Sequence, residues 1–241
     1  MTPMVAATAR RAVGVEIMDA GGYDHEEIRR NLADLRFYNA WLGGARLAMR
    51  EIGGMLGANA PRRLTLLDVA TGSADIPAAL ARWCGARGIA PRIAGLDANP
   101  DVLAEARRYL AASGRAEVSL VRADADRLPY ADGSVDVAIC SNFLHHLDGD
   151  LALAALREMG RVSRLGVVVI DLMRSRAALA SVYLLTRVTT SNRLTRHDGP
   201  LSVSRAFTPG ELASLAAEAG LPGAAVRRAG PVRMVLRWRR P

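Results

Sequence analysis

Three acidic side chains lie near the ends of apolar runs in this sequence. Asp68 is close to the end of the first run, Asp97 is at the tip of the second, and Asp124 lies two residues after the third. In an open parallel sheet, ligands bind outside the carboxyl ends of the strands, so we expect these carboxylates to meet at one edge. Asp97 then accepts hydrogen bonds from both hydroxyls of a ribose, and Asp124 accepts one from an adenine amino group.

Each of these roles has a plainer alternative. Asp97 could cap the helix that follows it, although Asn99 already fills that position. Asp124 could form an Asx turn at the end of its strand. The small-residue turn around Gly72, which follows the first run, predicts close approach of a ligand to the backbone, or an ordinary strand-to-helix turn.

Histidine is the side chain best suited to exchange a proton near neutral pH. His145 and His146 follow the fourth apolar run, His197 lies in an insertion after the fifth, and His25 begins a helix as a surface residue. If the chemistry requires a general base, we predict that it is His145, His146 or His197. A histidine in these positions can also have no acid–base role.

The elements that position these side chains follow from the periodicity of apolar residues. Helices between the first three apolar runs, at 74–87 and 100–112, indicate an alternating α/β pattern and a mostly parallel sheet covered on both faces. A capping box at Thr208 opens a further helix, and an antiparallel hairpin of residues 224–228 and 232–239 closes the sheet. The five buried strands are predicted at 64–70, 92–97, 118–122, 135–140 and 166–172.

The chain divides into a preface and a main domain. Helices at 24–42 and 45–56 predict an N-terminal helical cap over residues 1–58, followed by the domain at 59–241. Residues 177–204 interrupt the strand–helix rhythm and predict an apolar lid insertion over a hydrophobic substrate, although a core helix explains them nearly as well.

Composition excludes several classes of protein. No apolar stretch among the 241 residues approaches the ~20 needed to cross a bilayer, and no export leader is evident, so we expect a cytoplasmic protein. Cys84 and Cys140 offer neither a disulfide framework nor a zinc site, and no metal is expected. The net charge of +8 raises the question of nucleic acid. All 32 cations are arginines, and they are scattered without aromatic interleaving except in the final RWRRP, which disfavours a nucleic-acid role.

Several segments, taken in order, resemble the motifs of the class I S-adenosylmethionine-dependent methyltransferases. LLDVATGSAD resembles their first motif, GLDANP the acidic second, RADADRLPYADGSVDVAICSNFLHHL the adenine-binding and fourth motifs, and GVVVIDLM the strand that follows. The resemblance spans residues 64–173, and the C-terminal hairpin fits the family's reversed seventh strand. The sequence departs from the family at Ala70 and Ala74, where glycine is usual, so close backbone approach is in doubt there.

The resemblance implies a Rossmann-like methyltransferase fold with a seven-stranded sheet and S-adenosylmethionine as cofactor. Arg46, in the preface, is expected to pair with the carboxylate of the cofactor's methionyl part, or to be a plain surface cation. By resemblance, the other cofactor-binding positions are Asp68, Ala70, Gly72, Asp97, Ala98, Asp124, Ala125 and Ser141.

The whole sequence is similar to small-molecule methyltransferases of the ubiquinone and menaquinone type and of polyketide or phenolic-lipid pathways. We therefore expect methyl transfer to oxygen or carbon of an apolar, aromatic or polyketide-like small molecule. The segment after the fourth strand, from Cys140 to Phe143, lacks the patterns of enzymes that methylate base amines or C5 of pyrimidines. An RNA methyltransferase of the same fold and an NAD-dependent Rossmann oxidoreductase remain the alternatives.

Overall fold

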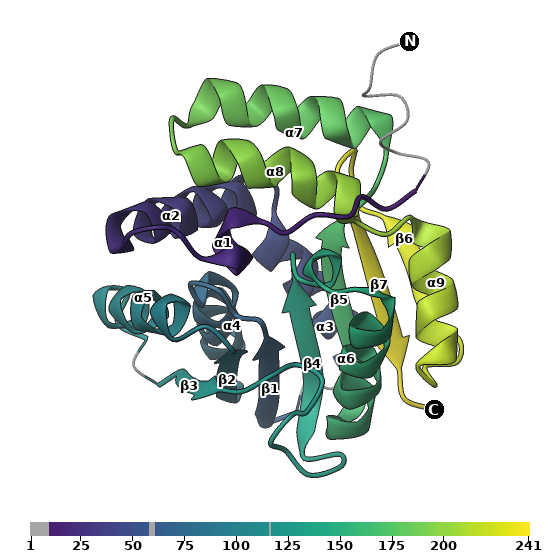
Figure 1. The fold of residues 1–241 in the computed structure, drawn as a ribbon. Helices are drawn as coiled ribbons and strands as arrows, with labels where there is room; N and C mark the ends of the chain where they lie inside the picture. Colours follow the sequence, from purple (N-terminus) through teal and green to yellow (C-terminus); the bar gives the residue numbers. More distant parts are fainter. Residues whose placement is uncertain (1–9, 58–60, 116) are drawn as a thin grey trace.

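A seven-stranded β-sheet forms the centre of the protein, as seen in a computed structural model that describes residues 10–57, 61–115 and 117–241 (Figure 1). The strand order is β3-β2-β1-β4-β5-β7-β6. The first five strands pair in parallel, whereas β7 is antiparallel to both β5 and β6. This is the predicted Rossmann-like methyltransferase fold, hairpin included. The strands are β1 (Arg63–Val69), β2 (Ala90–Asp97), β3 (Ser119–Arg122), β4 (Val135–Ser141), β5 (Ser163–Leu172), β6 (Ala225–Arg228) and β7 (Arg233–Arg239).

Helices cover both faces of this sheet. On one face α6 (Gly149–Val162) and α9 (Pro209–Glu218) pack in a core that includes Leu156, Leu212 and Trp238. On the other face α3 (Gly44–Leu56), α4 (Asp75–Gly85) and α5 (Pro100–Ala112) bury a second core that includes Ile52 and Leu80. Because α3 packs directly on the sheet, part of the expected N-terminal cap belongs to the main hydrophobic core.

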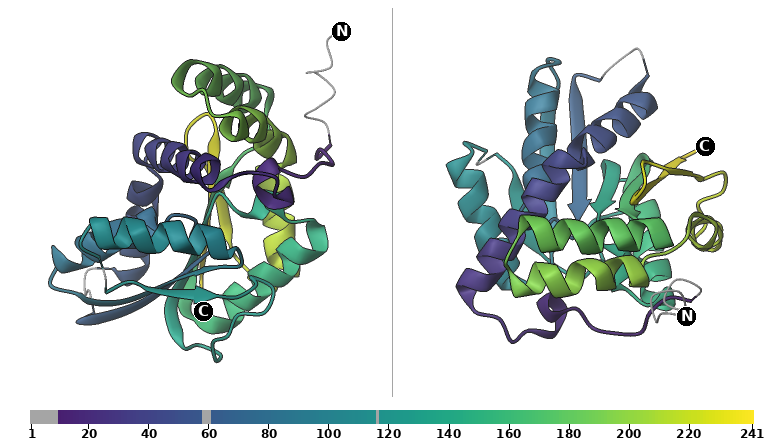
Figure 2. Two further views of the ribbon diagram at one scale, coloured as in Figure 1. Left: turned by 60° about the vertical axis from the view of Figure 1, so that its left-hand side comes forward. Right: turned by 90° about the horizontal axis from the view of Figure 1, so that it is seen from above.

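A third group of helices lies across the carboxyl ends of the parallel strands. It consists of α1 (Ile17–Ala20), α2 (His25–Trp41), α7 (Arg176–Thr189) and α8 (Arg193–Arg205), with the short 3-10 turn η2 (Leu144–His146) beneath. Seen from above, α7 and α8 run side by side over this edge (Figure 2). The expected insertion at 177–204 is therefore a helical hairpin above the sheet edge where the acidic residues were expected, and its function as a lid stays a prediction.

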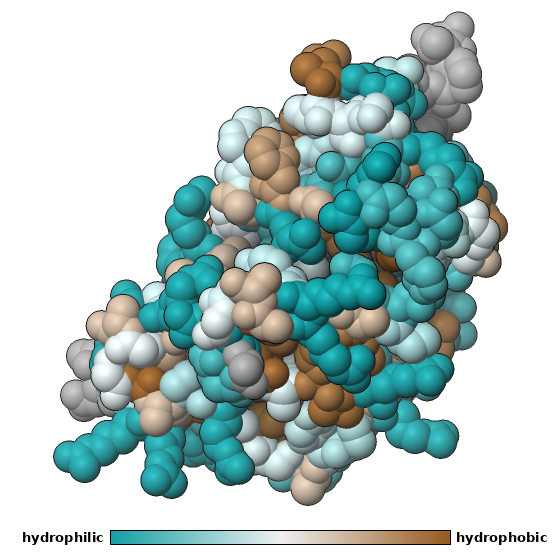
Figure 3. Space-filling view, turned by 90° about the vertical axis from the view of Figure 1, so that its left-hand side faces the viewer, coloured by the Kyte–Doolittle hydropathy of each residue, from teal (hydrophilic) through white to brown (hydrophobic). Residues whose placement is uncertain are grey.

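Local signals in the sequence determine where these helices begin. Asp24 and Thr208 each form a capping box with the glutamate three residues later, and Asn99 caps α5 ahead of Pro100. The sequence analysis did not identify α6, whose N-cap is Asp148. On the side of the molecule that carries α5, hydrophilic side chains predominate and apolar ones lie between them (Figure 3). Within the described residues, no helix is long and apolar enough to cross a membrane.

In the sequence of 232–239, Val232, Met234, Leu236 and Trp238 alternate with Arg233, Val235, Arg237 and Arg239, which predicts a half-buried strand. Strand β7 differs from this pattern. Met234, Leu236 and Trp238 are buried as expected, but Arg233 and Val235 on the opposite face are buried too. The reason is α3, which covers this end of the strand and brings Val235 into the second core. Only Arg237 and Arg239, farther along, remain exposed. The expected alternation is wrong at Arg233 because both faces of the sheet are covered there.

The close pairing of β5 with β7 depends on a glycine. A Cβ atom at Gly166 would lie 2.1 Å from the backbone oxygen of Trp238. We expect Gly166→Ala to lower the free energy of unfolding by about 3 kcal/mol, because the two strands must separate locally. Chemical denaturation of Gly85→Ala provides the control, since a Cβ there meets nothing within 4 Å. Equal stability of the two variants would contradict this account.

Candidate active site

A cavity of about 590 Å³ lies between the carboxyl ends of the parallel strands and the helices that cover them. Its volume is in the ordinary range for a small-molecule site. The turns after β1, β2, β4 and β5 form its floor, and residues of α1, α2, α7 and α8 form its walls. Among the described residues, the buried polar side-chain atoms without a hydrogen-bond partner belong, apart from Arg115, to side chains that line this cavity. They are on Glu16, Asn31, Asp68, Ser141, Asn142 and Arg233.

The turn after β1 keeps the backbone of a glycine loop without its usual glycines. Ala70 and Ala74 adopt φ angles of 54° and 58°, beside Gly72 at 56°. Such angles are uncommon for residues other than glycine and cost ~1–3 kcal/mol each. Ala70, Gly72 and Ser73 all line the cavity, so the backbone does approach the expected ligand position at this turn.

Asp68 is buried beneath this turn, with 2% of its surface exposed. Its Oδ2 atom accepts a hydrogen bond of 2.8 Å from the Thr71 hydroxyl, while Oδ1 has no partner among the described residues. Burial raises the pKa of Asp68 to about 7, against the Thr71 hydrogen bond, which lowers it. The side chain therefore changes charge near neutral pH and favours a cationic neighbour.

Asp97 lies at the tip of β2, as expected. Its Oδ2 and Oδ1 atoms accept hydrogen bonds of 3.1 Å from the backbone N–H groups of Gly72 and Asn99. Burial raises its pKa above the usual value. The alternative role as a helix cap is wrong, because the Asn99 side chain caps α5 through Asp101 and Val102. The carboxylate thus links the first two turns and faces the cavity.

His145 and Asp171 form a buried pair beside the cavity. His145 Nδ1 is 2.6 Å from Asp171 Oδ1, and the residues are 2% and 1% exposed. Asp171 also accepts from the backbone N–H groups of His145 and Leu172. Because a carboxylate only accepts, His145 Nδ1 is the donor in this hydrogen bond. Nε2 lies 3.9 Å from Glu16 Oε1, beyond hydrogen-bond distance.

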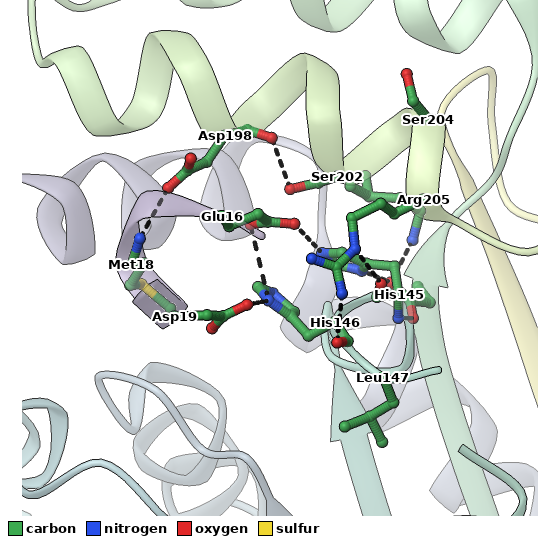
Figure 4. Close-up of polar contacts among 12 residues, drawn as sticks. Glu16, Met18, Asp19, His145, His146, Leu147, Asp198, Ser202, Ser204 and Arg205 are labelled. Carbon is green, nitrogen blue, oxygen red and sulfur yellow. Dashed lines mark hydrogen bonds and ion pairs between the residues drawn. The ribbon is translucent and has the colours of Figure 1, made fainter. Parts of the chain in front are cut away.

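His146 has different surroundings and a different charge. Its Nδ1 atom is 2.7 Å from Asp19 Oδ2 and 3.7 Å from Glu16 Oε2 (Figure 4). Burial disfavours its charged form, but the hydrogen bond to Asp19 and the nearby carboxylates outweigh burial and raise the pKa of His146 to about 9. His146 is therefore a cation at neutral pH, which makes His145 the better proton acceptor of the two.

Two residues of α8 hold the N-terminal segment over these histidines (Figure 4). The carboxylate of Asp198 accepts from the backbone N–H groups of Ile17 and Met18 at 2.9 and 3.2 Å. Arg205 donates to the backbone oxygen atoms of His145, His146 and Gly14. These contacts place Glu16 in the cavity wall beside the histidines that follow the fourth strand, although Glu16 is far from them in the sequence.

The cavity brings together most, but not all, of the residues predicted from sequence. Asp124 is exposed and lies outside the lining, although its neighbours Ala123 and Ala125 are within it. Arg46 is exposed in a separate hollow between α3 and Trp83. His197 is also exposed and pairs with Asp198 rather than facing the cavity. The predicted residues that do line the cavity are Asp68, Ala70, Gly72, Asp97, Ala98, Ala125, Ser141, His145 and His146.

Sequence reasoning missed several polar residues of the site, among them Glu16, Asn39, Asp171 and Arg233. Asp171 had a visible signal, an acid near the end of the apolar run 166–172. Glu16 and Arg233 had none, since they lie in a short segment before a helix and in an apparently half-exposed strand. Glu16, His145 and His146 also present ligand atoms within 4.8 Å of one another, a spacing at which a metal ion could be held.

Comparison with known proteins identifies the central domain. A family model described as a methyltransferase domain matches residues 66–166. A demethylmenaquinone methyltransferase of Shouchella clausii (strain KSM-K16) is 27% identical over 157 residues. That match covers 65% of this chain, which spans only 61% of the relative's length. Residues 66–166 are a class I S-adenosylmethionine-dependent methyltransferase domain.

Solved structures share the fold at low sequence identity. A SAM-dependent methyltransferase from Aquifex aeolicus is 16% identical with a TM-score of 0.62, over 90% of this chain and 98% of its own. An O-methyltransferase family protein from Burkholderia thailandensis is 14% identical with a TM-score of 0.64, over 94% and 64%. PigF, solved with SAH, is 19% identical with a TM-score of 0.60, over 93% and 65%. These likenesses confirm the methyltransferase fold.

The cavity of this methyltransferase domain has the polar groups that S-adenosylmethionine requires. Asp97 and the backbone around Ala98 and Ala125 lie at the adenosine end expected from the motifs. The unpaired, buried Oδ1 of Asp68 suits the cationic part of the cofactor, whose sulfonium and ammonium both carry positive charge. The donor set and the shape of the cavity therefore fit the family's cofactor.

We expect cofactor affinity to rise with pH in the range where Asp68 ionises. A cation favours the ionised carboxylate, so binding below pH 7 must release the proton of Asp68 and is weaker there. Calorimetric titration of S-adenosylmethionine between pH 5.5 and 8 measures this rise.

Asp68→Asn should flatten the pH dependence of cofactor binding. Thr71→Val removes a hydrogen bond that favours ionised Asp68 and should move the rise to higher pH. An unchanged pH profile in both variants would show that Asp68 does not carry the effect.

Proposed function

We propose that this protein transfers the methyl group of S-adenosylmethionine to an oxygen or carbon atom of an apolar, aromatic or polyketide-like small molecule. The observation that carries this proposal is the buried His145–Asp171 pair, whose histidine lines the same cavity as the turns expected to bind the cofactor. The cofactor supplies a methyl group already activated by the positive sulfur. What remains for the protein is to orient the acceptor and to take its proton.

His145 is the residue suited to take that proton. Asp171 fixes the ring through Nδ1 and stabilises the imidazolium that forms, so the proton of an acceptor hydroxyl or acidic C–H passes to Nε2 as methyl transfer occurs. The fixed positive charge of His146 nearby favours a phenolate or enolate in the acceptor. Asp171 acts here as a positioning residue.

The walls of the cavity favour an apolar acceptor. Leucines of α2, with Val182 and Leu185 of α7 and Phe143 after β4, surround the polar floor. Apolar side chains with a few placed polar groups are typical of small-molecule sites. The Shouchella relative is named for demethylmenaquinone, which agrees with an acceptor of this class.

A metal-assisted reaction is the second candidate, and the cluster of Glu16, His145 and His146 favours it. Asp171 holds the second ring nitrogen of His145, as carboxylates do for metal-ligating histidines. A divalent cation bound here would polarise an acceptor oxygen in place of a general base. Metal analysis of the purified protein, and turnover after dialysis against a chelator, distinguish the two mechanisms.

Cofactor binding is tested with a pair of carboxylate variants. We expect calorimetry to detect binding of S-adenosylmethionine and not of NAD. Asp97→Asn should weaken it by about 10- to 100-fold, because it removes a charged acceptor that faces the cavity. Asp124→Asn serves as the matched control and should change affinity less than about threefold, since its side chain lies outside the lining. Binding of NAD alone would contradict the proposed function.

Turnover tests the role of the histidine pair. With labelled cofactor and a panel of phenols and quinols, we expect His145→Asn to lower kcat by about 100-fold or more. Asp171→Asn should lower kcat and alter its pH profile while leaving KM for the cofactor unchanged, because it perturbs the ring and not the cofactor. His25→Asn, on the exposed start of α2, provides the control.

Three results would contradict this assignment. Wild-type rates in His145→Asn would exclude it as the base. Loss of turnover on chelation, restored by a divalent cation, would favour the metal-assisted reaction instead. Transfer to RNA in preference to the small molecules would overturn the proposed acceptor class.

A further inference from the structure

A buried arginine outside the matched domain faces the cavity and forms no ion pair with any of the described residues. Arg233 is the first residue of β7, is 2% exposed, and lines the cavity near the end of β5. Its Nη2 atom donates to Asn39 Oδ1 at 2.8 Å. Among the described residues, its Nε and Nη1 atoms have no hydrogen-bond partner.

The local structure makes room for this guanidinium but does not neutralise it. A Cβ atom at Gly44 would lie 3.1 Å from Nη1, so a larger residue there would crowd the group. Asn39 Oδ1 also accepts from Asn142 at 2.9 Å, and Asn39 is a neutral amide. The Nδ2 atom of Asn39 donates a hydrogen bond of 3.3 Å to Asp75. Asn39 therefore links the arginine to this carboxylate.

Arg174 shows how this protein treats a buried arginine that has a purely structural role. It is also buried, but it forms an ion pair with Glu211 at 2.6 Å and donates to the backbone oxygen of Ala206 at 2.7 Å. Among the described residues, Arg233 has no partner in direct contact that carries a negative charge. Burial lowers the pKa of Arg233 to about 10, although the charges of Asp171 and Asp75 oppose this, so the side chain remains charged at neutral pH.

We infer that Arg233 binds a carboxylate of a small molecule in the cavity. A carboxylate supplies both the missing negative charge and acceptors for the unpaired N–H groups, which makes it the natural partner of a desolvated guanidinium. The same cavity is lined by Asp68, whose Oδ1 atom is unpaired within the described residues. The cavity therefore holds a carboxylate at one point and a guanidinium at another. That pattern suits a ligand with an ammonium and a carboxylate.

Two ligands could bring this carboxylate. One is the cofactor, through its methionyl carboxylate, which the sequence analysis had assigned to Arg46. The other is an acidic acceptor, since Arg233 lies at the end of the sheet where β5 and β7 meet. This inference rests on the proposed function, because the cavity must admit a methyl donor and its acceptor.

Calorimetry on Arg233→Met with a matched pair of nucleosides tests the first source. S-adenosylhomocysteine carries the amino-acid carboxylate, whereas 5′-methylthioadenosine lacks it. If Arg233 binds the cofactor, the variant should lose about 30-fold or more in affinity for S-adenosylhomocysteine and keep its affinity for methylthioadenosine. Arg233→Lys should lose less. Arg237→Met, on the exposed part of the same strand, should match the wild type.

Thermal shifts with benzoate test the second source. In protein saturated with S-adenosylhomocysteine, benzoate should raise the Tm of the wild type and not that of Arg233→Met, and neutral benzamide should act alike on both. This result, with nucleoside affinities unchanged, assigns the carboxylate to the acceptor.

The outcomes separate this inference from the proposed function and from a structural role. If Arg233→Met alters neither the nucleoside preference nor the benzoate shift, the inference is wrong. If it lowers the Tm of the free protein and weakens both nucleosides equally, Arg233 is structural and the inference is also wrong. Wild-type protein that binds neither nucleoside contradicts the proposed function, and benzoate and benzamide shifts measured without any nucleoside then decide on Arg233.

Discussion

Uncompensated charge at the carboxyl edge of the sheet is the constraint on which the rest of the site depends. Asp68 and Arg233 are both buried, and each keeps polar atoms without partners in the described part of the chain. Burying such groups costs free energy that the apolar cores on the two faces must offset. The two packed cores therefore supply the free energy that keeps this edge of the sheet folded. A ligand of suitable charge would supply the partners that these buried polar atoms lack.

The helices above this edge complete the site with segments distant in sequence. Asp198 and Arg205 of α8 hold the N-terminal segment so that Glu16 and Asp19 meet the histidines that follow β4. The two histidines have different partners: the carboxylates of Asp19 and Glu16 hold His146 as a cation, whereas Asp171 fixes the ring of His145 through Nδ1. Two adjacent residues thus acquire different chemistry from their surroundings.

Sequence reasoning was accurate where local physics decides the structure. Helix caps such as Asn99, the alternating strands and helices, and the acid at the tip of β2 depend on neighbours a few residues away, and the structure contains them as predicted. It was less accurate where tertiary packing decides which way a side chain faces. Arg46 was expected to bind the carboxylate of the cofactor, but it lies on the exposed side of α3. Arg233 was expected to be half-exposed, but the packing of α3 buries it. Asp124 has the right spacing, yet its side chain is exposed while its neighbours line the cavity.

The left-handed alanines of the turn after β1 have a consequence for ligand selection. Alanine has less conformational freedom than glycine, so Ala70 and Ala74 make this turn more rigid than the glycine-containing turn usual in the family. The methyl group of Ala70, which lines the cavity, also occupies space that glycine would leave open. A rigid, slightly narrowed turn of this kind discriminates by shape, and analogues with bulkier substituents on the ribose side would be rejected rather than accommodated.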